Sequence, residues 1–405
     1  MPDLKINGVP FTPKRGVDYG YDFGAWEDKL HAKPDDCELG VWHRTVTREL
    51  FAECLWAWVA FALKLPFAEH PFVIQACVDV QRGRNDRTCD IWARGHCKST
   101  IITCARTLKL ICNDPEKTVC IFSYTKAAAL KFFNQIKNIL EESGFLKWLY
   151  PDVLYDDPTR QAQKWSEDAG LFVKRKGFQK EPTLIASGLI EGMPTGGHYF
   201  LRIYDDVMVE DLVNSPDQVE LLKERFDISK NLGVDGGWEW VIGTPYTPED
   251  LIQKVRSLTR ADGTKIYQVR EKPATEGGEW NGKPVFLSPD FLEELRTNRR
   301  KFASQQLLNP TPTEIRKMDP AMLKVVDPSE IPKNLYRFMV IDPAGERKDR
   351  PGDAWAMHLV GVEPYRDDLG LSDIYLLDSI IRELTFEEAH EELVKMYLNG
   401  GRILQ

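Results

Sequence analysis

The sequence predicts an α/β fold whose central sheet is mainly parallel, and three observations indicate this. Asp90–Thr103 has the pattern of a short apolar strand, a tight loop and the start of a helix. The apolar run Thr118–Tyr124 is typical of a buried strand, and an amphipathic helix over Lys126–Glu142 follows it. A further strand, Tyr199–Tyr204, ends in two acids. Strands that alternate with helices in this way build parallel sheets, whose ligands lie at the carboxyl ends of the strands.

Length and composition bound the possible classes of protein. The chain has 405 residues, 42% of them apolar and 28% charged, which is ordinary globular composition with room for two or three domains. The longest apolar stretch, Leu55–Leu65, is short and interrupted by Lys64, so we expect a buried helix and no membrane span. The N-terminus has no secretory pattern, so we expect a cytosolic protein.

The cysteines and the net charge exclude two further classes. All eight cysteines lie between Cys37 and Cys120 without a Cys-x-x-Cys pair, so we expect reduced core thiols, neither a disulfide framework nor a zinc knuckle. A net charge of −9 argues against a uniformly basic surface, although it leaves room for nucleic acid at a local basic patch.

The loop after the first strand has the design of a phosphate-binding loop. Lys98 and Ser99 stand at the start of a helix, where backbone N–H groups, the lysine and the hydroxyl face a phosphate and its Mg²⁺. The usual pattern is Gly-x-x-x-x-Gly-Lys-Ser/Thr, but Trp92 and Cys97 occupy the glycine positions and only Gly95 lies inside the loop. An ordinary strand-to-helix turn with a solvated Lys and Ser is the alternative.

Two acids, Asp205 and Asp206, follow the strand Tyr199–Tyr204. A phosphate-loop enzyme needs one carboxylate for Mg²⁺ and a second one to orient or deprotonate the attacking water. Paired acids also occur in plain turns. Their position about a hundred residues after Lys98 and Ser99, in a chain of alternating strands and helices, favours the enzymatic interpretation.

These motifs, together with stretches further along the chain, resemble the large terminase subunit of tailed bacteriophages. The resemblance extends over roughly residues 85–405 and keeps its order. The matching stretches are Ala93–Thr100, Gly197–His198, Ile203–Val207, Ile242–Tyr246, Ser288–Arg296, Phe302–Gln306, Phe338–Ala344 and Ile374–Asp378. The resemblance implies a P-loop ATPase domain with a parallel-rich sheet, followed by an RNase H-like nuclease domain.

The resemblance assigns nucleotide-binding roles to the residues of the loop. Lys98 binds the β- and γ-phosphates of ATP, and Ser99 and Asp205 hold Mg²⁺. The remaining loop positions of this ATP site are Gly95, His96, Cys97 and Thr100.

Three further residues receive roles near the γ-phosphate. Asp206 takes the position of the catalytic carboxylate, which is a glutamate in many relatives. Arg94 resembles an arginine that senses or stabilises the γ-phosphate, with a structural salt bridge as the alternative. Thr244 belongs to the element that couples hydrolysis to movement, although a Gly-Thr-Pro turn looks the same without that function.

The nuclease part is expected from about residue 332 onward. Its predicted elements are strands at Tyr336–Ile341, Trp355–Val362 and Asp373–Ile380 and a helix at Thr385–Leu398. Asp342, with Asp378 beside it, would hold divalent Mg²⁺ or Mn²⁺ for attack on a phosphodiester. The chain stops at Arg402–Gln405 as another strand begins, so we expect an incomplete nuclease domain whose remaining acid lies beyond the chain end.

The predicted domains are a helical cap (residues 1–84), the ATPase core (85–260), a linker or lid subdomain (261–331) and the nuclease part (332–405). The resemblance implies double-stranded DNA, the portal protein of the procapsid and the small terminase subunit as partners. It also implies a homo-oligomeric ring on the portal, transient docking in the host cytoplasm and no lasting place in the virion. Two alternatives are a helicase-like ATPase of a mobile element and a non-catalytic DNA-binding or scaffold protein with a degenerate phosphate loop.

Overall fold

A computed structural model of the chain contains two compact units, residues 1–317 and 318–405. It describes residues 4–6, 9–194, 196–212, 215–248, 250–310, 324–343, 354–364 and 373–399. The predicted residues Ala344 and Arg402–Gln405 therefore lie outside the described part. The finer division of residues 1–331 into cap, core and lid remains a prediction.

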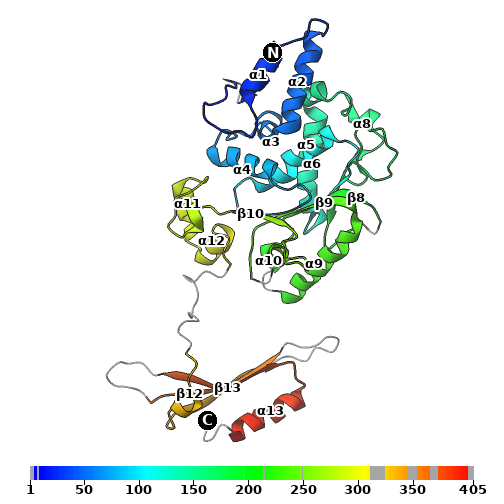
Figure 1. Ribbon diagram of the computed structural model, residues 1–405. Coiled ribbons are helices and arrows are strands. Elements are labelled where there is room, and N and C mark those ends of the chain that lie inside the picture. Colours follow the sequence, from blue (N-terminus) through cyan, green and yellow to red (C-terminus); the bar gives the residue numbers. More distant parts are fainter. Residues whose placement is uncertain are drawn as a thin grey trace. The chain divides into compact units, whose positions relative to one another are not determined.

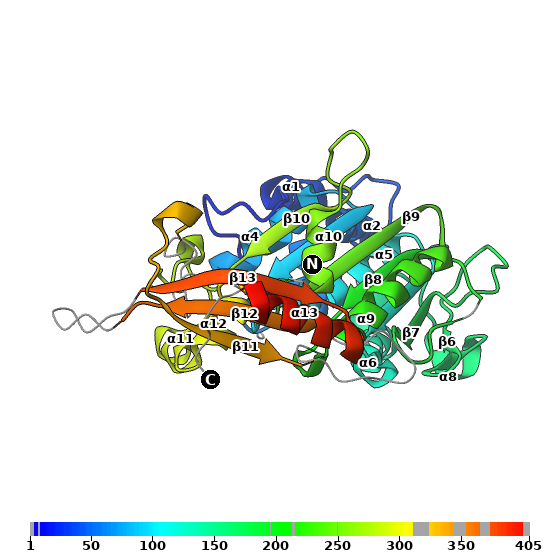
Figure 2. The ribbon, with the colours of Figure 1, turned by 90° about the horizontal axis from the view of Figure 1, so that it is seen from below.

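The first unit is built on an eight-stranded sheet, and Figure 2 shows several of its strands side by side. The order across the sheet is β10-β3-β9-β8-β4-β7-β6-β5, and the strands from β10 to β7 are parallel. The strands are β3 (Arg87–Trp92), β4 (Val119–Ser123), β5 (Trp165–Ser166), β6 (Gly170–Leu171), β7 (Leu184–Gly188), β8 (Tyr199–Asp205), β9 (Gly233–Gly243) and β10 (Gln268–Lys272). The prediction of a parallel-rich α/β fold is confirmed.

Helices cover both faces of this sheet (Figure 1). Strand residues alternate between two cores because successive side chains of a strand point to opposite faces. In β4, Val119 and Ile121 join one core and Cys120 and Phe122 join the other. The first core includes helices α2 (Leu39–Glu53), α4 (Pro71–Arg82) and α6 (Lys126–Glu142), and the second includes α9 (Pro216–Ser229) and α10 (Leu251–Ser257).

The remaining elements of the first unit are short. They are β1 (Lys5–Ile6), β2 (Val9–Pro10), α1 (Phe23–His31), α3 (Leu55–Ala57), η1 (Trp58–Ala62), α5 (Thr107–Asn113), α7 (Gly144–Leu149), α8 (Pro158–Gln161), η3 (Glu210–Leu212), η4 (Lys230–Leu232), η5 (Glu276–Gly278), α11 (Pro289–Arg296) and α12 (Arg299–Gln305). All eight cysteines are free thiols, and six of them are buried. No helix of the described residues is both long and apolar enough to cross a membrane.

The helix after the phosphate loop begins as a π-helix, η2 (Ser99–Arg106), and continues as α5. The prediction of a helix in this region is confirmed, but its first turns are π-helical instead of α-helical. π-Helical turns are rare and occur often at functional sites. Here the π-turns lie directly after Lys98, at the residues that face β8.

The second unit is a three-stranded antiparallel sheet with one helix. The order is β11 (Tyr336–Asp342), β12 (Trp355–Val362) and β13 (Ile374–Arg382), and α13 (Phe386–Asn399) packs on β12 through a small core. The 3₁₀ turn η8 (Pro328–Glu330) precedes β11. These elements match the predicted three strands and helix.

Candidate nucleotide-binding site

The sheet order brings three predicted segments together at the carboxyl ends of its strands. The phosphate loop follows β3, Thr244 follows β9, and Asp205 ends β8. Because β9 lies between β3 and β8 and all three are parallel, these ends share one edge of the sheet. Ligand sites of open parallel sheets lie in this position.

Lys98 stands at the end of the loop and is 8% exposed. Gly95 and Cys97 both have left-handed backbone conformations, with φ of +82° and +59°. Glycine adopts such a conformation freely, whereas a residue with a side chain is strained by roughly 1–2 kcal/mol. Cys97 therefore has a glycine-like conformation at the position where the usual loop pattern has glycine.

Asp205 is the best-defined acid of the site, since it is fully buried and held by two hydroxyl groups. Ser99 Oγ donates a hydrogen bond to its Oδ1 over 3.1 Å, and Thr103 Oγ1 donates to its Oδ2 over 2.5 Å. Burial raises the pKa of Asp205 well above its usual range, the Asp206 carboxylate adds to this rise, and Thr103, Lys98 and Ser99 oppose it. No basic group among the described residues forms an ion pair with Asp205.

This arrangement fits a divalent cation. A buried carboxylate whose hydrogen-bond partners are both neutral gains most from a positive charge beside it. Mg²⁺ in nucleotide sites takes oxygen ligands from one or two protein groups together with the phosphates. Ser99 and Asp205, the two predicted ligands of Mg²⁺, present oxygen atoms in contact with each other. The described residues contain no group of three or more His, Cys, Asp or Glu side chains suited to a metal ion.

Asp206, Arg94 and Tyr246 lie at the exposed side of the site. Asp206 is exposed and has a left-handed φ of +49°, and its carbonyl accepts a hydrogen bond from the Tyr124 N–H over 3.3 Å. Arg94 Nη1 donates to the Tyr246 hydroxyl over 3.4 Å. Burial raises the pKa of Tyr246, Arg94 lowers it, and the charges of Asp206 and Glu210 raise it further. Arg94 and Asp206 thus flank the same tyrosine.

Thr244 is buried beside the start of the loop. Its Oγ1 donates a hydrogen bond to the backbone oxygen of Trp92, the last residue of β3, over 3.1 Å. The residue that follows β9 is thereby tied to the residue that leads into the phosphate loop. The coupling role of Thr244 remains a prediction.

The ring of His96 lies in an aromatic cluster. Its ring contacts Phe72 and Phe286 at centroid distances of 5.2 and 5.6 Å, and its Nδ1 is 3.1 Å from the Arg94 backbone oxygen. This contact requires a proton on Nδ1, because a carbonyl only accepts. Burial lowers the pKa of His96 to about 4. The ring is therefore neutral near pH 7 and fixes the loop.

The segment after β10 also holds the loop. The N–H groups of Ala93 and Arg94 donate to the backbone oxygens of Lys272 (2.9 Å) and Gln305 (3.0 Å). The Leu287 side chain lies beside Gly95, and Phe286 belongs to the same segment. Residues 272–305, which include much of the predicted lid subdomain, thus pack directly on the phosphate loop.

Sequence reasoning did not identify Thr103, Tyr246 or the aromatic partners of His96. Thr103 follows Ser99 by about one helical turn, so this spacing is a signal that points to the same acid. Tyr246 and Phe286 gave no comparable signal, because their contacts join segments about 150 and 190 residues from the loop. Only the tertiary fold makes them neighbours.

Asp342 and Asp378, the predicted acids of the nuclease part, are not brought together. Asp342 pairs with Ala356 and Asp378 with Leu359, so the acids lie on the two outer strands, three positions apart along β12. With strands about 4.8 Å apart and about 3.4 Å per residue, their separation is on the order of 14 Å. The expectation that Asp378 approaches Asp342 is therefore wrong for this arrangement, because the register separates them.

No protein-family profile matches the chain, and no curated protein matches it. Among solved structures, a large terminase from a thermophilic bacteriophage is 15% identical, with a TM-score of 0.35, over 78% of this chain and 69% of that one. The bacteriophage HK97 large terminase is 15% identical, with a TM-score of 0.37, over 75% and 60%. The Thermus phage P74-26 large terminase ATPase domain is 14% identical, with a TM-score of 0.33, over 55% and 86%. These three structures come from the family that the sequence motifs resemble.

Proposed function

We propose that the chain is an ATP-hydrolysing motor subunit that moves double-stranded DNA, of the large terminase kind. The observation that carries the ATPase part is the contact of Ser99 with the buried Asp205, beside Lys98. Three segments, from β3, β8 and β9, converge there with the chemistry of a Mg²⁺–ATP site. The resemblance of the motifs carries the DNA-packaging part.

The residues divide the work of hydrolysis among them. Lys98 and the N–H groups of the loop bind the phosphates, and Ser99 and Asp205 hold Mg²⁺, which neutralises phosphate charge when bound. Asp206, exposed beside the buried acid, orients the attacking water and accepts its proton. Arg94, which contacts the Tyr246 hydroxyl, compensates the charge that develops on the γ-phosphate.

Thr244 and the segment 272–305 transmit the change in the site. Thr244 joins the end of β9 to Trp92, and the later segment holds the N–H groups of Ala93 and Arg94. A shift of the loop between nucleotide states therefore displaces both neighbours. Such small displacements at a packed contact are the usual origin of larger movements in motors.

The packaging role includes several partners. The motor works as a ring of copies on the portal of the procapsid, receives DNA with the small terminase subunit and acts in the host cytoplasm. The second unit belongs to a metal-dependent nuclease that cuts the concatemeric DNA. Within the described residues the acids of that unit are separate, so cutting requires groups besides Asp342 and Asp378.

The test is ATP hydrolysis measured with and without Mg²⁺ and with and without double-stranded DNA. We expect turnover that requires Mg²⁺ and rises with DNA, and loss of that turnover in Lys98→Ala. Absence of turnover under all conditions would leave the non-catalytic DNA-binding protein, with Cys97 marking a degenerate loop, as the better account.

DNA affinity measured across a salt series on two unrelated duplexes tests the motor. A translocase holds the phosphate backbone, so its affinity should fall steeply with salt and be the same for both sequences. A DNA affinity that does not change with salt concentration would contradict the translocase proposal. Strand separation without a portal would identify the helicase-like alternative.

A further inference from the structure

A second cavity lies on the same sheet but away from the phosphate loop. It has a volume of about 260 Å³ and lies between helix α5 and the middle of β9. Its wall includes two tryptophans, two basic residues and two asparagines, namely Trp238, Trp240, Arg106, Lys109, Asn85 and Asn113. The predicted ATP-site residues are absent from this wall.

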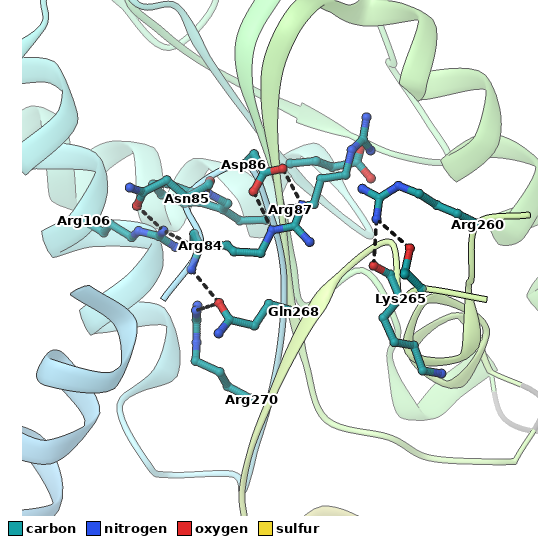
Figure 3. A network of polar contacts seen from close by, with 12 residues as sticks. Arg84, Asn85, Asp86, Arg87, Arg106, Arg260, Lys265, Gln268 and Arg270 are labelled. Atoms are coloured by element: carbon teal, nitrogen blue, oxygen red, sulfur yellow. Dashed lines mark hydrogen bonds and ion pairs between the residues drawn. The ribbon is translucent and has the colours of Figure 1, made fainter. Parts of the chain in front are cut away.

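Arg106 is the unusual member of the wall, because it is 5% exposed and forms no ion pair within the described residues. Its Nη2 donates to the Arg84 backbone oxygen (3.1 Å) and to Asn85 Oδ1 (2.8 Å), as Figure 3 shows. Its Nη1 is buried without a partner in the described part of the chain. Buried charges are normally paired with an opposite charge, but this guanidinium has only neutral acceptors, and its Nη1 has none.

The surroundings of Arg106 add positive charge. Burial and the charge of Arg270 lower the pKa of Arg106 to about 9, and Asp90 only partly offsets this. Asp90 is itself engaged by Arg270 through two hydrogen bonds of 2.7 and 2.6 Å. The acid that acts on Arg106, Asp90, is thus already paired with Arg270, and an anion from outside is the group that would complete the pairing.

Lys109 supplies a second cation one helical turn further along. Its Nζ donates to the Glu53 backbone oxygen over 3.1 Å and, among the described residues, forms no ion pair. Burial lowers its pKa. The acid in the wall, Asp114, lies 3.7 Å from Lys117, which is outside the wall. The cavity therefore presents an excess of positive charge.

The two tryptophans contribute apolar indole surface to the cavity wall. The Trp238 and Trp240 rings are stacked at an interplanar angle of 28°, with centroids 6.2 Å apart, and the Arg106 guanidinium lies 3.8 Å from the Trp240 centroid. Indole surfaces bind flat rings well. We propose that this cavity binds a small organic anion with a flat ring system, its charge between Arg106 and Lys109 and its ring system along the indoles.

Calorimetric titration of the full chain tests the site. The chain carries Lys98→Ala, so that binding at the phosphate loop is weakened, and the probes are adenosine monophosphate, benzoate and inorganic phosphate. We expect at least one of the two ring-bearing anions to bind more tightly than phosphate. Tighter binding of adenosine monophosphate would identify a nucleotide as the ligand class, and tighter binding of benzoate an aromatic carboxylate.

Variants locate the binding. Lys109→Met and Arg106→Met should each weaken the bound anion at least tenfold, whereas Lys131→Met, an exposed lysine on α6 outside the cavity, should not. Lys109→Met carries the test if Arg106→Met fails to fold. No binding of either ring-bearing anion, phosphate binding as tightly as both, or equal affinities in Lys109→Met and Lys131→Met would overturn the proposal.

Discussion

In the first unit the fold brings a predicted acid into contact with its site, whereas in the second unit it keeps the predicted acids apart. In the first unit, Asp205 lies more than a hundred residues from Ser99, yet parallel strand order places the two in contact. In the second unit, Asp342 and Asp378 are only 36 positions apart in the sequence, and an antiparallel register separates them. Proximity in a site thus depends on which strand ends share an edge of the sheet, and closeness along the chain has little influence.

The largest expected effect is on ATP turnover at the converged site. Lys98→Ala and Asp205→Ala should each reduce turnover by at least about 100-fold, because each removes a preorganised charge or metal ligand. Circular dichroism and thermal unfolding check that the fold remains. A variant with near-normal turnover would contradict the assignment of the loop.

Asp206→Asn separates the roles of the two neighbouring acids. It should reduce turnover by about 100-fold, the usual contribution of a positioned acid–base group, with a much smaller effect on ATP binding. Turnover and the dissociation constant for ATP are measured on the same preparation. If binding is lost instead, Asp206 is a metal ligand, and the division between the buried and the exposed acid is wrong.

The regular elements of both units could be predicted from local patterns. Helix α6 has its predicted bounds, Lys126–Glu142, because its apolar residues repeat at helical spacing and Thr125 caps its first turn. Strand β10 (Gln268–Lys272) was missed, since Arg270 makes the segment look exposed. In the fold Asp90 pairs with that arginine, a contact between positions 180 residues apart.

Residues of the candidate site could be predicted only where a short sequence motif contains them. Lys98, Ser99 and Asp205 belong to short patterns that the sequence displays. The aromatic partners of His96, the hydroxyl of Tyr246 and the separation of Asp342 from Asp378 depend on long-range contacts and strand register. A single sequence has no local signal for either.

The pH dependence of the unfolding free energy tests whether His96 is packed in a neutral form against the phosphate loop. Its pKa is about 4 in the folded state, below the usual 6.5 of the unfolded chain, so the unfolded state gains a proton first as the pH falls. The stability contributed by neutral His96 is full above about pH 6.5 and is lost progressively down to about pH 4. Between pH 7 and pH 5 this loss is about 2 kcal/mol.

The measurement is urea unfolding at pH 7 and pH 5 for the parent chain and for His96→Gln. The difference in unfolding free energy between the two chains should shrink by about 2 kcal/mol at the lower pH. A parent and a His96→Gln variant with the same pH dependence would mean that the ring is not held neutral.

Cys97→Gly examines backbone strain in the loop, and its effect should be small. Glycine removes roughly 1–2 kcal/mol of left-handed strain but loses a similar amount in unfolded-chain entropy, so stability should change by less than about 1 kcal/mol. Turnover should be retained. Cys97→Val is the contrast, since a β-branched residue fits this conformation poorly and should reduce both stability and turnover. Equal behaviour of the two variants would show that the conformation of Cys97 is not needed.

The smallest expected effect belongs to the second unit. Two-metal cleavage of DNA needs several carboxylates around ions about 4 Å apart, and acids on the order of 14 Å apart cannot hold both ions. With supercoiled plasmid and Mn²⁺, the chain should therefore cut weakly or not at all, and Asp342→Ala should not differ from the parent. Robust cleavage that disappears in Asp342→Ala would show that other groups complete a site around Asp342. The second unit would then also bring its site residues together, and the contrast with the first unit would no longer hold.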